Sequence, residues 1–142
     1  MRILTCIAIG VAALLMAPSS AVLAQQKVDL GKREYDSNCM ICHGAKGKGD
    51  GMYRANLTRP PTDLTTLSQR NGGVFPFQTV YESIDGTRDI AAHGPRDMPI
   101  WGMVYRSRAG EFYGPDVPYD PNAFVRARIY ALIDYVQRLQ VK

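Results

Sequence analysis

The chain has 142 residues, of which 46% are hydrophobic and 21% are charged, and its formal net charge is +4. This length fits one globular domain and leaves no room for a second catalytic domain. The basic residues are spread along the chain, which does not favour nucleic-acid binding, and three cysteines exclude a disulfide-rich scaffold.

The first 24 residues have the pattern of a secretory signal peptide. Arg2 precedes an almost wholly apolar run over residues 3–17, and small residues follow a proline in residues 18–24. We therefore expect export, with cleavage between Ala24 and Gln25. The run is short for a membrane anchor, which needs about 20 apolar residues, and Cys6 lies too early in it for a lipid anchor. The mature chain, residues 25–142, keeps a net charge of +3 and is expected to have no membrane anchor.

Residues 26–41 predict a first helix, and it leads into the sequence Cys39-Met40-Ile41-Cys42-His43. Two thiols at this spacing are compatible with a thioredoxin-like redox pair, a zinc site or covalent attachment of haem. The redox pair needs a preceding strand, but residues 32–38 are polar and helix-like. Zinc needs four ligands, and the other histidine, His93, is 50 residues after His43. Haem attachment fits best, because one helical turn places both sulfur atoms along one porphyrin edge.

This motif in an exported chain resembles that of the monohaem class I c-type cytochromes of the bacterial periplasm. The resemblance covers nearly all of residues 25–142, which are expected to form one cytochrome c domain. It implies an all-α fold, in which small helices and loops wrap one covalently attached haem c and the N- and C-terminal helices cross. Cys39 and Cys42 would hold the porphyrin as thioethers, and His43 would bind the iron. Gly31 and Tyr35 match the small and aromatic pair of the family's first helix.

Turn-forming residues follow the motif. Residues 44–51 contain four glycines and two lysines, which predicts a surface loop, and the order of a phosphate-binding loop is absent. Pro60 and Pro61 exclude a helix through residues 57–64. In the family, a loop proline near this point supplies its carbonyl oxygen to the axial histidine, so Pro60 and Pro61 are both candidates for the partner of His43. Residues 75–84 then predict a helix that Gly86 would end.

The segment Asp97-Met98-Pro99-Ile100-Trp101 resembles the distal segment of the same family. The resemblance implies that the thioether of Met98 is the sixth iron ligand, with Pro99 stiffening the backbone beside it. Met98 is preferred over four alternatives, each with a specific weakness. Met40 lies between the thiols, Met52 is only nine residues after His43, Met103 lacks a following proline, and His93 would give bis-histidine ligation.

Residues 101–121 form a longer link than short members of the family have. The segment contains Tyr105, Phe112, Tyr113 and Tyr119. We interpret it as a loop that covers an additional part of the haem edge, with a docking face for a partner protein as the alternative.

The last predicted helix opens at Pro121-Asn122-Ala123. Its apolar residues recur at spacings of 3, 4 and 7, which predicts one buried face. Residues 132–136 resemble the family's terminal helix. We expect this helix to cross the first one at Gly31, with Tyr35 and Tyr135 packed around the crossing.

The expected function follows from the two iron ligands that the chain would supply. With His43 and Met98 both bound, no position is open to a substrate, so we expect an electron-transfer protein and not an enzyme. The preferred function is a periplasmic carrier that shuttles single electrons between redox partner proteins, which are membrane or periplasmic oxidoreductases. The alternatives are the cytochrome subunit of a specific periplasmic dehydrogenase, and a haem enzyme or sensor with a labile distal ligand. Four basic residues are a candidate docking patch: Lys46, Lys48, Arg54 and Arg59.

Overall fold

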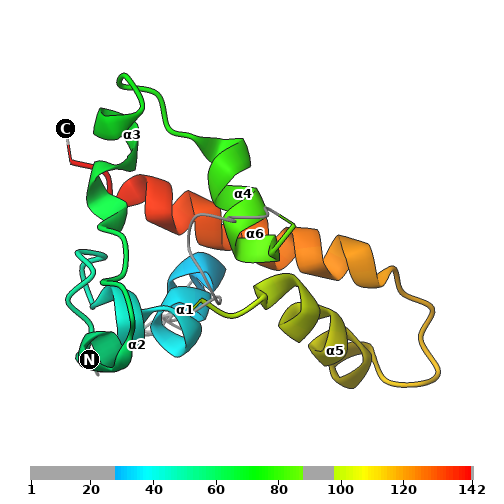
Figure 1. Cartoon of the computed structure of the whole chain (residues 1–142). Helices are drawn as coiled ribbons and strands as arrows, with labels where there is room; N and C mark the ends of the chain where they lie inside the picture. The colour runs from blue at the N-terminus through cyan, green and yellow to red at the C-terminus, as the bar shows by residue number, and fades with distance from the viewer. Residues whose placement is uncertain (1–27, 88–97, 142) are drawn as a thin grey trace, which may run out of the picture.

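The computed structural model describes residues 28–87 and 98–141, so the predicted signal peptide and His93 lie outside the described residues. The described residues are helical and contain no strand, which confirms the expected all-α fold. Figure 1 shows the longest helix, α6, running across the molecule with other helices packed along it. The helices are α1 (Leu30–Asn38), α2 (Met40–His43), η1 (Met52–Asn56), η2 (Leu64–Thr66), α3 (Leu67–Arg70), α4 (Phe77–Asp85), α5 (Trp101–Tyr113) and α6 (Pro121–Arg138).

The predicted first helix begins later than expected, because Asp29 caps it. Oδ1 of Asp29 accepts a hydrogen bond from the backbone N–H of Lys32 at 2.9 Å. The other carboxylate oxygen of Asp29 pairs with Arg138 of α6 at 2.7 Å. The cap therefore starts α1 at Leu30 and also ties it to the end of the chain.

The predicted helix is also divided in two at the first thiol. The backbone N–H of Cys39 closes α1 by donating to the carbonyl of Tyr35 at 2.8 Å, and the carbonyl of Cys39 opens α2 by accepting from His43 at 2.9 Å. Cys39 therefore lies at the junction of two helices, and the prediction of one continuous helix over 26–41 is wrong.

The two terminal helices cross at Gly31, as predicted. A side chain at this position would collide with the backbone carbonyl of Ala131 on α6. The rings of Tyr35 and Tyr135 lie 5.0 Å apart beside the crossing. Tyr35 is fully buried, and its hydroxyl donates to the carbonyl of Gly44 at 2.6 Å. Tyr35 at the crossing therefore links α1, which precedes the thiols, to the loop that begins at Gly44.

The hydrophobic core follows the buried face of α6, as the spacing of its apolar residues predicted. Helix α4 adds Val80 and Ile84 to this core, and it ends at Gly86 in the left-handed conformation (φ 91°), also as predicted. Its first turn starts at Phe77, two residues later than expected. The core residues from α6 are Phe124, Val125, Ile129, Leu132, Ile133 and Val136.

Residues 101–113 form a helix, so the prediction of a loop over residues 101–121 is wrong for most of this segment. Gly102, Tyr105 and Ala109 are buried along one face of α5, which packs against α4 and α6. Gly102 is so close to Asp85 at the end of α4 that a side chain would collide with it. Only residues 114–120 form an irregular link to α6, which is visible beyond α5 in Figure 1.

Candidate functional site

Cys39, Cys42 and His43 lie where α1 and α2 meet. Cys39 is only 9% exposed and belongs to the core, whereas Cys42 and His43 are partly exposed. Both thiols are free. The backbone N–H of Cys42 donates to the carbonyl of Cys39 at 3.1 Å, so one helical turn separates the thiols. The structure therefore brings together the three residues of the predicted attachment site.

The environment of the thiols argues against a thioredoxin-like pair. Burial raises the pKa of Cys39 to about 12, with a further contribution from the carboxylate of Glu34. Burial also raises the pKa of Cys42. Redox-active pairs depend instead on a thiolate with a lowered pKa. A zinc site has no better support, because no three His, Cys, Asp or Glu side chains gather at one point among the described residues.

The His43 ring is held by the backbone of the loop that follows η1. Its Nδ1 lies 3.1 Å from the carbonyl oxygen of Thr62. A carbonyl oxygen only accepts hydrogen bonds, so Nδ1 carries the proton and Nε2 of the neutral ring keeps the lone pair that binds a metal. Burial lowers the pKa of His43, and this effect outweighs the opposing one of the Thr62 hydrogen bond. The neutral, ligand-competent form of the ring is therefore favoured.

This contact corrects the sequence prediction of the partner of His43. A carbonyl partner for His43 was expected from Pro60 or Pro61, and the structure supplies it from Thr62. The glycine-rich loop sets this register, because Gly49 lies so close to the carbonyl of Pro61 that a side chain would collide with it. The N–H of Leu64 then donates to the carbonyl of Gly47 at 2.7 Å. Between these two contacts, Thr62 is the residue that reaches His43.

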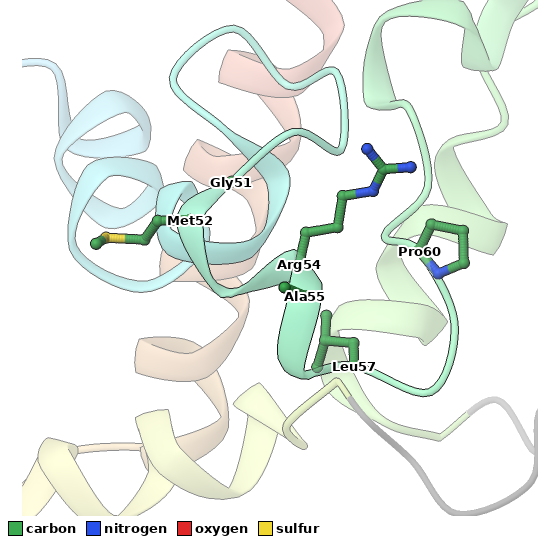
Figure 2. Close-up of a pocket in the computed structure, with 6 residues that line it drawn as sticks. All are labelled: Gly51, Met52, Arg54, Ala55, Leu57 and Pro60. Atoms are coloured by element: carbon green, nitrogen blue, oxygen red, sulfur yellow. The ribbon is translucent and has the colours of Figure 1, made fainter.

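A shallow hollow lies beside the site, on the η1 side (Figure 2). In Figure 2, Pro60 lies across the hollow from Arg54 and Leu57, while Met52 points away on the other side of η1. Gly51 allows the start of η1 to lie close to α2, because a side chain at this position would collide with the backbone of Ile41 and Cys42. The predicted basic residues are all exposed on the segment between α2 and η2: Lys46, Lys48, Arg54 and Arg59.

The methionines that are candidate iron ligands differ in how deeply they are buried. Met98 is partly buried and packs against the core cluster that contains Cys39 and Tyr105. By contrast, Met52 is 86% exposed, Met103 is 68% exposed and Met40 is 39% exposed. A sulfur atom that binds iron in a closed site must lie next to the apolar interior. Among the methionines of the described residues, Met98 meets this requirement best.

These groups fit the haem that the sequence motif implies. Two uncrosslinked thiols one helical turn apart suit two thioether bonds. The Thr62 carbonyl leaves Nε2 of His43 available to iron, and Met98 offers a soft, sheltered donor. The residues at the junction of α1 and α2 therefore fit a covalently attached haem.

Comparison with known proteins gives one family match. The family model described as "Cytochrome C oxidase, cbb3-type, subunit III" matches residues 26–107, which is more than half of the chain. The matched range includes the two thiols, His43 and Met98, and it ends within α5. No curated protein and no solved structure matches the chain.

Proposed function

The chain belongs to this cytochrome c family, and we propose that it is a periplasmic carrier of single electrons. As a member of the family it binds haem c covalently, transfers electrons and acts with redox partner proteins. Export to the periplasm rests on the signal-peptide pattern of residues 1–24, and the mature cytochrome domain is residues 25–142. In the described residues, no helix has the length and apolar character needed to span a membrane.

In this proposal Cys39 and Cys42 hold the haem, and His43 and Met98 are its iron ligands. When bound, the iron takes up and releases one electron at a time. The Thr62 carbonyl keeps the proton of His43 on Nδ1, which orients Nε2 and makes it a better donor. The orientation of His43 one helical turn after a buried thiol is the observation that carries the proposal.

The carrier function follows from the number of ligands that the chain supplies. His43 and Met98 together would fill both axial positions, so a substrate would have to displace a ligand to reach the iron. The same six ligands would serve both oxidation states, and the chain would rearrange little when an electron moves. The proposal is therefore electron transfer without catalysis by the chain itself.

Replacing Met98 by alanine tests the distal ligand. We expect the oxidised protein to lose the weak absorption band at the red end of the visible spectrum that reports sulfur on ferric iron. The Met103→Ala variant is the matched control and should keep the band, because Met103 is exposed on α5. The measurement is the visible spectrum of the purified, haem-loaded variants.

Two outcomes would contradict this ligand assignment. Survival of the band in Met98→Ala, with its loss in Met103→Ala, would identify Met103 as the ligand. Rapid binding of carbon monoxide by the reduced wild-type protein would show a labile sixth position and favour a haem enzyme or sensor.

One surface favours a second candidate function, a permanent subunit of a specific periplasmic dehydrogenase. Phe112 at the end of α5 is 64% exposed, and its ring contacts that of Tyr113, which stacks on the 37% exposed Tyr119 of the following link. Neighbouring apolar side chains of this kind are typical of protein interfaces. In that case the exported protein should co-purify with the dehydrogenase at a fixed stoichiometry, whereas an independent carrier should be isolated alone.

A further inference from the structure

A buried ion pair joins α1 to α6 close to the proposed haem attachment site. Nη1 of Arg128 donates to Oε1 of Glu34. The two side chains are only 19% and 9% exposed, whereas the side chains of four other ion pairs are at least 36% exposed. The Glu34–Arg128 pair is therefore shielded from water much more than these surface pairs.

Further contacts fix both members of the pair. Nδ2 of Asn38 donates to Oε2 of Glu34 at 3.0 Å. The guanidinium carbon of Arg128 lies 4.8 Å from the centre of the Phe124 ring and 5.7 Å from that of Phe112. These contacts hold the carboxylate and the guanidinium in one fixed arrangement between α1 and α6.

Glu34 faces the same buried region as the first thiol. Its carboxylate contributes to the raised pKa of Cys39 and of Tyr105, second in each case to burial. Tyr105 is 1% exposed, so the space around its hydroxyl is closed to solvent. This region is therefore shielded from solvent, so a charge there acts on a nearby ion more strongly than a charge at the surface does.

We propose that the charges of Glu34 and Arg128 each act on the reduction potential of the haem held at Cys39, in opposite directions. The inference rests on the proposed function, because it takes Cys39 as an attachment site. The ferric site carries one more positive charge than the ferrous site. Glu34 therefore stabilises the ferric state and Arg128 the ferrous state, and their effects oppose each other in the wild-type protein.

Three variants test this proposal through the midpoint potential of the haem-loaded protein. Glu34→Gln should shift the equilibrium towards the reduced form by about tenfold, or ~59 mV upwards. Arg128→Gln should shift it in the opposite direction by a similar factor. The double variant should return to within about twofold of the wild type, because neither charge remains unpaired. The potentials are measured at about pH 8, above the ordinary pKa of a carboxyl group.

The matched control is Asp36→Asn, which removes a carboxylate nearer to Cys39 in sequence but on the exposed side of α1. Its potential should stay close to that of the wild type, because solvent screens the charge. Shifts of the same sign in both single variants, or shifts no larger than that of Asp36→Asn, would overturn the inference. If one single variant does not fold, the other single variant and the double variant still determine the sign. A wild-type protein without covalent haem would instead overturn the proposed function.

Discussion

Replacing Cys39 and Cys42 together by alanine should yield a chain that carries no covalent haem and does not unfold cooperatively. Both thioether bonds depend on these sulfur atoms, and Cys39 lies within the hydrophobic core. The chain is short and contains 13 glycines and nine prolines, so we expect the attached ring to supply a large share of the buried apolar surface. Mass spectrometry of the exported product should give residues 25–142 plus one haem for the wild type, and residues 25–142 alone for the variant.

The Met40→Ala variant is the control for this experiment. Met40 lies between the two thiols and is 39% exposed, so its replacement should leave the attached haem and the thermal transition in place. A cooperative, native-like far-UV melt of the haem-free double-alanine variant would show that the chain folds without the ring. A wild-type product that is colourless, when made in a host that attaches haem c, would contradict haem attachment itself.

Replacing Gly31 by alanine should destabilise the protein, against the helix propensity of the two residues. Alanine favours a helix over glycine by about 1 kcal/mol, so propensity alone predicts a gain in stability. A Cβ atom at residue 31 would instead collide with the carbonyl of Ala131 and press against Tyr135. Overpacking of this kind costs about 1–3 kcal/mol, and the rigid backbone contact favours the upper part of that range.

The measurement is the free energy of unfolding of the haem-loaded protein from denaturant titration. Ser37→Ala is the matched control, because Ser37 is exposed on the same helix and its replacement should change stability little. An unchanged or increased stability of Gly31→Ala would show that α1 and α6 separate easily at the crossing.

The part of the site that lies within one short segment was predictable from the sequence. The thiols and His43 lie within five consecutive residues, so their relative placement depends only on a helical turn. The partner of His43 comes from 19 residues further along. Its identity depends on how the glycine-rich loop packs against residues 61–64, and a sequence pattern could narrow it only to neighbouring prolines.

Helix α5 was missed for a different reason. Its sequence mixes charged, aromatic and small residues, so no strong apolar repeat indicates a helix. A usable signal was the absence of proline between Pro99 and Pro115, together with Gly102, Tyr105 and Ala109 on one helical face. The reason for these small residues becomes clear only when the neighbouring helices are known, because Gly102 lies against the end of α4 and Ala109 is fully buried.

The sequence alone determined the covalent chemistry, the helical class and the crossing of the terminal helices, since each depends on local spacing or on a single small residue such as Gly31. Tertiary structure decided which groups contact the residues of the site and its surroundings. Thr62 reaches His43 through loop packing, and Arg128 reaches Glu34 from 94 residues away. Contacts between distant segments depend on the burial of the whole core, and no short pattern in the chain records them.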